Sequence, residues 1–264
     1  MKALLISALS AHLRFVDLPG EEPAFVLLHG LGASSSSDFP AVAHTPSLSS
    51  YRFILPDFFG FGYSDRPADF DYSIQAHAET VYEVLHSVGL AGVNLFGHSM
   101  GGTVAVALAA AHPELVRSIV LAEANLDPGH GQGSKSIAEQ PENEYITKGH
   151  VQFIEGIRKS IKDEPGLAGY LGALALADPR AMYRSAVGLI RSVRPSPREL
   201  FLSMTIPRAF IVGERSLPYP SLDTLRSAGI SVLTVAKAGH AMMDDNPEGF
   251  AAAFLEAFVP VLYG

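Results

Sequence analysis

The pentapeptide Gly97-His98-Ser99-Met100-Gly101 restricts the fold of this chain more than any other feature. An apolar run of strand type, 93–96, precedes it, and an Ala- and Val-rich run of helical type, 103–111, follows it. Glycines on both sides allow a turn in which a side chain would meet the neighbouring backbone. A G-x-S-x-G pattern between a strand and a helix exposes the serine hydroxyl at the end of the strand. The sequence therefore predicts that Ser99 is a nucleophile on a strained turn.

Short apolar runs recur along the chain with helical or loop-like stretches between them. They are nearly continuous rather than alternating, which is typical of strands that are covered on both faces of a parallel sheet. We expect strands at 24–30, 52–57, 93–97, 118–123, 208–214 and 231–240. Helices are expected after Asp71 or Ser73, over 103–112, and from Asn246, which would cap a helix beginning at Pro247. The pattern predicts an α/β fold.

The first residues resemble a weak signal peptide, with one lysine and a short apolar run ending near Ala11. Because a similar run leads directly into the next strand, we interpret the two runs as a hairpin and expect a cytoplasmic protein. A second apolar stretch, 87–113, is long enough to span a bilayer. Polar residues and glycines interrupt its middle, so we expect a buried strand, turn and helix there and no membrane anchor.

One region departs from the alternation of strands and helices. Between residues 126 and 200 the strand-like runs disappear and helical patterns take over. An insertion after the carboxyl end of a strand lies over the crevice where α/β sheets bind ligands. We therefore predict a core domain made of residues 1–125 and 201–264, and a helical cap, or lid, made of residues 126–200.

Charge and composition exclude several classes of function. The 19 Lys and Arg residues and 27 Asp and Glu residues give a net charge of -8, which does not attract nucleic acid. The absence of cysteine excludes disulfides, thiolate metal sites and a cysteine nucleophile. The chain also lacks the HExxH zinc pattern and the GxxxxGK[ST] phosphate loop. We expect neither a metal nor a cofactor.

Together with the pentapeptide, three further segments resemble the α/β-hydrolase-fold serine hydrolases: 29–32 after an early strand, 57–64 after the next, and Gly239-His240 after the last. The resemblance covers essentially the whole chain. It implies a mostly parallel central sheet flanked by helices, with a helical cap. It also implies an oxyanion hole made by the backbone N–H groups of Leu31 and Met100, where two fixed donors stabilise a tetrahedral intermediate.

Serine needs a neighbouring base, and ten histidines are candidates. His240 follows the last predicted strand, which places it at the carboxyl edge of the sheet beside Ser99, so we predict that His240 is the general base. We interpret His29 as a buried structural histidine and His98 as a pocket wall or packing residue. Surface positions are expected for His77, His86 and His112.

The third member of the triad departs from the commonest family pattern. Many relatives carry an Asp shortly after a Gly-Glu pair, but here Gly213-Glu214-Arg215 is followed by serine. A minority of the family, including one type of haloalkane dehalogenase and zearalenone-type lactonases, place a Glu after the strand that follows the nucleophile helix. Glu123 occupies that place and is our predicted acid. Glu214 and Asp223 remain alternatives.

These residues predict a cofactor-free serine hydrolase of a carboxylic ester or lactone. The expected apolar pocket would involve His98, Phe58, Phe59, Tyr145 and Phe153. A carbon–carbon bond hydrolase of a β-diketone-like substrate uses similar groups and remains an alternative, as does a ligand-binding or signalling protein with a slow triad. Dehalogenases and epoxide hydrolases are disfavoured, because their nucleophile is Asp. We expect a small-molecule substrate, no nucleic-acid partner, and a monomer or homodimer.

Overall fold

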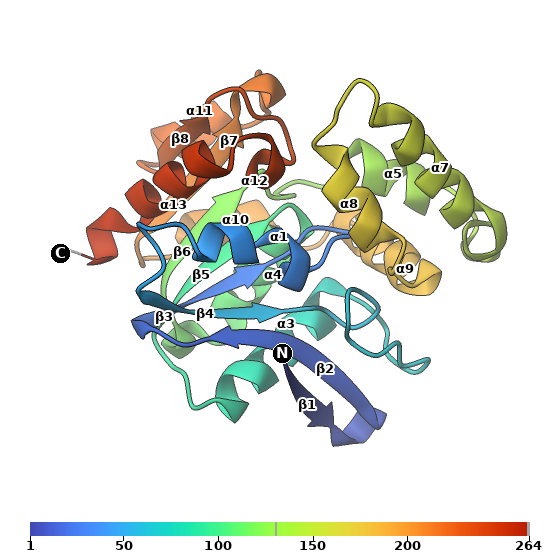
Figure 1. Ribbon diagram of the computed structural model, residues 1–264, viewed down its shortest axis with the longest axis horizontal. Helices are drawn as coiled ribbons and strands as arrows, with labels where there is room; N and C mark the ends of the chain where they lie inside the picture. The colour runs from blue at the N-terminus through green and yellow to red at the C-terminus, as the bar shows by residue number, and fades with distance from the viewer. Residues whose placement is uncertain (130, 263–264) are drawn as a thin grey trace.

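The computed structural model describes residues 1–129 and 131–262 and is built around one eight-stranded sheet (Figure 1). The strands are β1 Lys2–Ile6, β2 Ala11–Leu18, β3 Glu21–Leu28, β4 Tyr51–Pro56, β5 Val93–His98, β6 Val116–Ala122, β7 Arg208–Gly213 and β8 Ser231–Val235. Their order is β1-β2-β4-β3-β5-β6-β7-β8. Strands β3 to β8 pair in parallel, whereas β2 is antiparallel to both β1 and β4.

The helices cover both faces of the sheet. They are α1 Ser35–Asp38, α2 Pro40–Ala43, α3 Ile74–Ser87, α4 Met100–Ala111, α5 Gln132–Ala138, α6 Glu142–Glu144, α7 His150–Ser160, α8 Leu167–Leu174, α9 Pro179–Ile190, α10 Pro197–Ser203, α11 Leu222–Ser227, α12 Met242–Asp245 and α13 Pro247–Leu262. Short 3₁₀ turns occur at Ser7–Leu9, Pro113–Leu115 and Glu214–Ser216, and a π-helical turn at Tyr145–Gly149.

The central strands are apolar on both sides because both sides are buried. In β3, Val26 and Leu28 pack in one core cluster with α3 and α4, while Phe25 and Leu27 pack in the other with α2 and α13. Successive side chains of a strand point to opposite faces, so a strand that is buried on both faces reads as a continuous apolar run. The predicted α/β class and mostly parallel sheet are confirmed.

Most predicted elements appear at their expected places. The N-terminal runs form the antiparallel pair β1 and β2. Ser73 caps α3 by accepting a hydrogen bond from Ala76 N–H, and Asn246 accepts one from Gly249 N–H at the start of α13. The last predicted strand was too long: β8 ends at Val235, and the remaining residues to 240 form a loop. That loop carries His240 back over the sheet.

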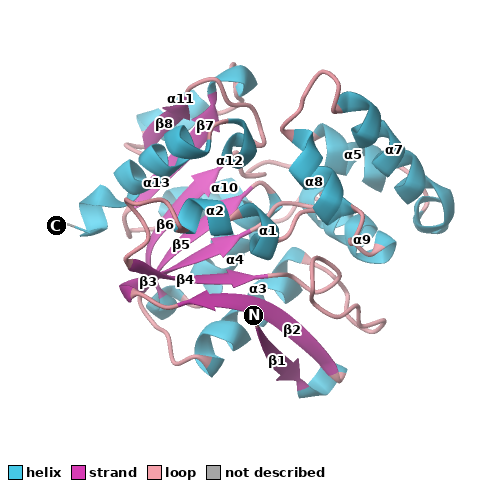
Figure 2. Ribbon diagram, in the orientation of Figure 1, coloured by secondary structure: helices cyan, strands magenta, loops and turns pink. Residues whose placement is uncertain are grey.

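The helices α5 to α9 lie together beside the carboxyl ends of the strands (Figure 2). They belong to the segment between β6 and β7, which is where the cap is predicted. Helix α10, near the end of that segment, packs against α4. The exact division of the chain into core and cap stays a prediction. In the described part of the chain, no helix combines the length and apolar character needed to cross a bilayer.

Candidate active site

Ser99 occupies the sharp turn between β5 and α4. Its backbone is strained, with φ 53° and ψ -119°. A Cβ atom at Gly97 would collide with the backbone of Gly101 and Gly102, and one at Gly101 would collide with the backbone of Leu28 and His29. The glycines of the pentapeptide are therefore required by close backbone packing, and the turn holds Ser99 at the end of the central strand.

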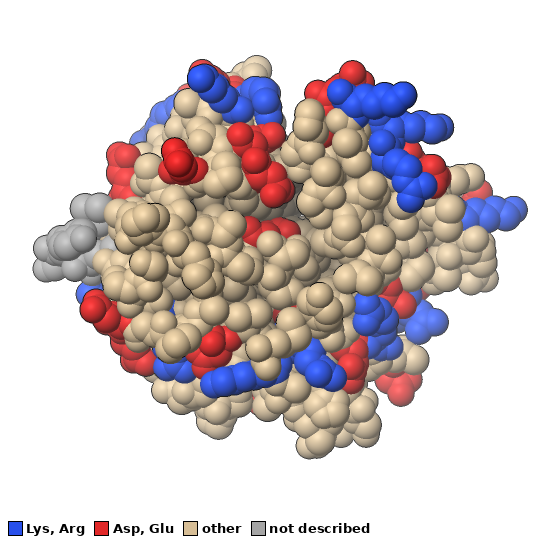
Figure 3. Space-filling model, in the orientation of Figure 1, with Lys and Arg blue, Asp and Glu red and all other residues tan. Residues whose placement is uncertain are grey.

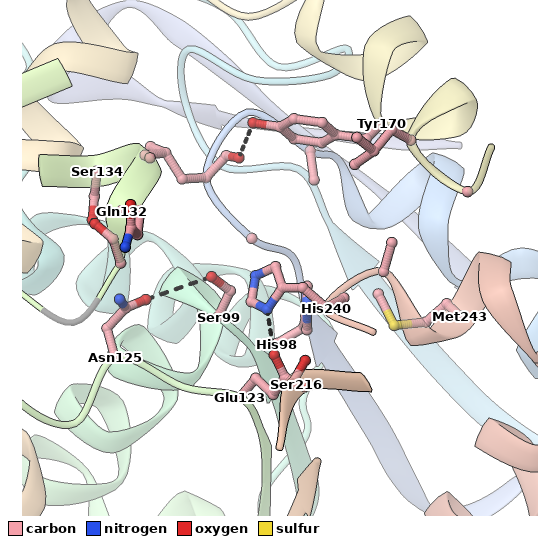
Figure 4. Close-up of a pocket in the computed structure, with 18 of the residues that line it drawn as sticks. His98, Ser99, Glu123, Asn125, Gln132, Ser134, Tyr170, Ser216, His240 and Met243 are labelled. Atoms are coloured by element: carbon pink, nitrogen blue, oxygen red, sulfur yellow. Dashed lines mark hydrogen bonds and ion pairs between the residues drawn. The ribbon is translucent and has the colours of Figure 1, made fainter. Parts of the chain in front are cut away.

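His240 and Glu123 meet at this edge of the sheet. The Nδ1 atom of His240 lies 2.7 Å from Oε2 of Glu123, and since a carboxylate can only accept, Nδ1 carries the proton. The other ring nitrogen, Nε2, then has a free lone pair. Figure 4 shows the His240 ring between Glu123 and Ser99, with its second nitrogen turned toward the serine side chain. In serine hydrolases a nucleophile, a base and an orienting acid lie in this order.

Glu123 is held in its ionised form by its contacts. It follows β6 with a left-handed φ of 42°, and its Oε1 atom accepts a hydrogen bond from Gly213 N–H on β7 at 2.9 Å. Burial acts to raise the pKa of Glu123, but hydrogen bonds from His240, Gly213 and Ser216 outweigh it and hold that pKa below its usual value. An ionised Glu123 can stabilise the positive charge that His240 gains when its ring is protonated.

The two alternative acids lie elsewhere. Glu214 accepts a hydrogen bond from Lys237 N–H at 2.7 Å at an exposed position. The side chain of Asp223 is fully exposed and pairs with Arg226. Among the described residues, Glu123 is the carboxylate that contacts the ring of His240.

His98 fixes the position of His240. Its Nε2 atom donates a hydrogen bond to the backbone carbonyl of His240 at 2.9 Å, and the two rings lie 4.6 Å apart. Burial and the neighbouring His240 lower the pKa of His98 to about 3, so its ring is neutral. His98 also lines the cavity described below, as expected for a pocket wall. The bond to His240 has no signal in the sequence, because it joins residues 142 positions apart.

His29 has a structural role here. Its Nε2 atom accepts from Phe58 N–H at 3.1 Å, and Nδ1 donates to the carbonyl of Gly30 at 2.8 Å. Burial lowers the pKa of His29 to about 4, although the nearby Asp57 opposes that shift. The neutral ring joins the loop after β3 to the loop after β4.

The expected surface position of His77 is wrong. His77 is fully buried, Ser185 on α9 contacts its Nε2 atom at 3.0 Å, and burial together with His29 lowers its pKa to about 3. It faces α9 because α9 packs on α3, a contact that the pattern of α3 alone does not predict. His86 is exposed, and His112 is partly exposed beside Glu79.

A cavity of about 590 Å³ lies beside Ser99 and His240. Of the five predicted pocket residues, His98 and Phe153 line it. Phe58, Phe59 and Tyr145 do not line it, because all three are fully buried. Phe58 packs against His29 and His77, Phe59 against Phe70, and Tyr145 against His150 and Tyr183. The loop after β4 turns its aromatic side chains into the core.

The two residues predicted to form the oxyanion hole lie near Ser99, and their role stays a prediction. Leu31 lines the cavity in the loop after β3. Met100 is the first residue of α4, and N–H groups in the first turn of a helix have no acceptor within that helix. Both predicted donors are therefore on segments that flank the nucleophile.

Comparison with known proteins agrees with the observed fold. Residues 23–137 match the model of a family described as alpha/beta hydrolase fold. A thermophilic esterase from Thermogutta terrifontis has a similar structure over 99% of both chains, with a TM-score of 0.81 and 20% identity. A mutant of the N-acyl homoserine lactonase AidH, complexed with N-hexanoyl homoserine, matches 100% of this chain and 97% of its own, with a TM-score of 0.81 and 22% identity. The chain has the alpha/beta hydrolase fold.

In sequence, the 2-hydroxymuconate semialdehyde hydrolase of Pseudomonas putida is 41% identical to this α/β-hydrolase over 102 residues. Those residues make up 39% of this chain but 36% of that protein, so the likeness spans about a third of the relative's length.

Two contacts at the cavity were missed by sequence reasoning. Ser99 Oγ donates to Asn125 Oδ1 at 3.5 Å, the long limit for such a bond, and Asn125 lines the cavity. Tyr170, on α8, donates its hydroxyl hydrogen to the carbonyl of Leu31 at 3.1 Å. Asn125 follows the predicted acid by two residues, which is a signal that could have been used. Tyr170 lies 139 positions from its partner and carries no such signal.

The bond from Tyr170 ties α8 to the loop after β3. We expect Tyr170→Phe to lower the free energy of unfolding by about 1 kcal/mol, the net contribution of one hydrogen bond. Urea unfolding measures this difference. Tyr63→Phe is the matched control, because Tyr63 is 60% exposed. Equal unfolding free energies for Tyr170→Phe and Tyr63→Phe would show that the bond does not stabilise the fold.

In the described part of the α/β-hydrolase, no group of three or more His, Asp or Glu side chains is arranged to hold a metal ion.

Proposed function

We propose that this protein is a serine hydrolase that cleaves a carboxylic ester or lactone, with Ser99 as nucleophile, His240 as general base and Glu123 as the orienting acid. The observation that carries the proposal is the 2.7 Å contact between His240 Nδ1 and Glu123 Oε2. It fixes the tautomer that leaves Nε2 free to accept a proton, on the side of the ring that faces Ser99.

The reaction would proceed in two halves. His240 Nε2 takes the hydroxyl proton as Ser99 Oγ attacks the substrate carbonyl, and the N–H groups of Leu31 and Met100 stabilise the oxyanion. His240 then gives the proton to the leaving alkoxide, which completes the acyl-enzyme. In the second half, His240 deprotonates a water molecule that attacks the acyl carbonyl, and the proton returns to Ser99 Oγ. Each removed oxyanion donor would cost about 3 kcal/mol of transition-state stabilisation.

The names of the structural neighbours favour ester and lactone chemistry, since an esterase and an acyl homoserine lactonase share the fold over nearly the whole chain. Fold alone does not fix the substrate, because one catalytic arrangement serves many reactions. The shape and charge of the cavity must select among them.

Carbon–carbon bond hydrolysis is the second candidate, supported by the 41% identity to a 2-hydroxymuconate semialdehyde hydrolase over 102 residues. The same serine, base and oxyanion donors can act on a carbonyl flanked by a carbon leaving group. A receptor with a slow triad would show turnover far below that of an enzyme.

The test is kcat/KM for 4-nitrophenyl esters from acetate to octanoate, with Ser99→Ala measured in parallel. We expect multiple turnover that Ser99→Ala abolishes, with an optimum chain length set by the cavity of about 590 Å³. A folded protein without turnover on any ester of the series would contradict the proposal and favour the carbon–carbon substrate or the receptor.

A further inference from the structure

The charges around the cavity are of one sign. Its lining contains the carboxylates Asp38, Glu123, Glu164, Asp244 and Asp245, and none of the described lining residues is Lys or Arg. In Figure 3, red atoms border the hollow between the cap and the core, over α12 and α1, and no blue atoms lie within it. The electrostatic potential inside the cavity is therefore negative.

Two of the five carboxylates are neutralised locally. Glu123 is hydrogen bonded to His240, and Asp245 forms an ion pair with Arg215 at 2.6 Å and accepts from Gly239 N–H. In the described part of the chain, Asp38, Glu164 and Asp244 form no ion pair with a cation. These three residues come from α1, from the turn before α8, and from α12, so they surround the cavity instead of forming one surface cluster.

The pKa of Asp38 sets the pH at which this negative field is complete. Burial, together with the negative charges of Asp244 and Asp57, raises the pKa of Asp38 to about 7, so Asp38 carries its full negative charge only above about pH 8. Burial and the adjacent Asp245 likewise raise the pKa of Asp244. A substrate carboxylate that binds near Asp38 or Asp244 would be disfavoured by the same burial and negative charge.

Part of the cavity wall, on the cap side, is apolar. Phe153, Ile157, Leu167 and Leu189 line it, from α7, α8 and α9. This wall can bury an uncharged acyl chain or ring, and burial of apolar surface supplies binding energy in proportion to area. An anionic substrate would gain the same contacts only after losing its hydration beside Asp38 and Asp244.

We infer that the cavity selects uncharged esters or lactones and excludes substrates that carry a carboxylate on the acyl side. The inference rests on the proposed function and narrows its substrate class. It also disfavours the carbon–carbon alternative, because a semialdehyde of a dicarboxylic acid retains one carboxylate. The carboxylates of the cavity repel a substrate carboxylate. Repulsion between like charges suppresses the binding of the wrong partner.

The experiment compares three esters that differ at one end of the acyl chain. They are 4-nitrophenyl pentanoate, the mono-4-nitrophenyl ester of glutaric acid, and the methyl ester of that monoester. The second ends in a carboxylate where the first has a methyl group, and the third has a neutral polar end of similar size. Ser99→Ala supplies the background rate for each. At about pH 8.5, where Asp38 is ionised, we expect kcat/KM for the anion to be about 100-fold below that of either neutral ester.

Variants then identify the source of the selection. In the double variant Asp38→Asn with Asp244→Asn, we expect the neutral-to-anion ratio to fall about ten-fold, because two isosteric amides remove the repulsion. Asp223→Asn is the control, since the side chain of Asp223 is fully exposed on α11 and lies outside the cavity lining. The ratio is measured within each variant, so a change in the amount of folded protein does not alter it.

The outcomes separate the two proposals. Equal kcat/KM for the anionic and neutral esters would overturn the inference and leave the proposed function intact, as would a ratio that the double variant does not change. Absence of turnover on all three esters would overturn the proposed function, and the inference with it.

Discussion

We expect Glu123→Gln to lower kcat by about 10⁴ while the protein remains folded. A glutamine has the shape of the carboxylate, and its carbonyl oxygen can still accept from Gly213 N–H. Its amide group would then donate toward His240, which stabilises the tautomer with Nε2 protonated, and that nitrogen can no longer accept the proton of Ser99. The loss therefore appears in kcat for every ester, measured by steady-state kinetics beside a circular dichroism spectrum.

Glu214→Gln provides the matched comparison. Glu214 lies after β7, where many relatives of this fold place the acid, but its carboxylate contacts Lys237 N–H at an exposed position. We expect nearly unchanged kcat for this variant. A silent Glu123→Gln together with an inactive Glu214→Gln would move the acid to the commoner position and refute our assignment.

We expect the protein to lose stability steeply below about pH 6.5. His29, His77 and His98 are buried, and burial lowers their pKa values to about 4, 3 and 3. In the unfolded chain their pKa values are near 6.5, so below that pH the unfolded state binds protons that the folded state does not bind. The stabilisation from these neutral histidines is complete above pH 6.5. It is lost as the pH falls toward their pKa values in the folded protein. Each histidine changes the free energy of unfolding by up to about 1.4 kcal/mol per pH unit.

Asp38 changes the free energy of unfolding with pH in the opposite direction. Its folded pKa is raised to about 7, so between roughly pH 4 and pH 7 the folded state binds a proton that the unfolded state releases. For these three histidines and Asp38 together, the protein takes up about two protons net when it unfolds near pH 5. We therefore expect the free energy of unfolding to fall by about 3 kcal/mol per pH unit near pH 5. Total stabilities of about 5 to 15 kcal/mol make this a large effect.

Urea unfolding at pH 4.5 to 7.5 measures the slope directly. His77→Gln should reduce this slope by about 1.4 kcal/mol per pH unit, because it removes one of the three histidines considered above. His86→Gln is the control, since His86 lies exposed on the same helix. A wild-type slope near zero, or equal slopes in the two variants, would show that the buried histidines do not govern acid stability.

The sequence predicts the parts of this protein that depend on local patterns. Strands buried on both faces give continuous apolar runs, and the turn around Ser99 needs its glycines whatever the rest of the chain does. His240 and Glu123 follow strands, and parallel strands bring their carboxyl ends to one edge, so the two side chains could be predicted to meet there.

Side-chain directions in loops and contacts between distant segments could not be predicted in this way. Phe58 and Phe59 follow a strand just as Glu123 does. Their loop nevertheless packs into the core, where the N–H of Phe58 donates to the ring of His29. His77 faces inward because of a helix about a hundred residues further along the chain. The same holds for the bond from His98 to the His240 backbone. Each of these depends on packing that no single segment specifies.

Strand β7 supports Glu123 through the backbone N–H of Gly213 and, in the proposed assignment, supplies no catalytic side chain. Beyond Ser216, the connection from β7 to α11 still borders the cavity, through Tyr219 and Pro220. Tyr219 also donates its hydroxyl hydrogen to the carbonyl of Ala124 at 3.2 Å, which supports the backbone beside Glu123. For protein engineering, Pro220 is therefore the position of this connection to randomise, with Tyr219 kept, when a new substrate range is wanted.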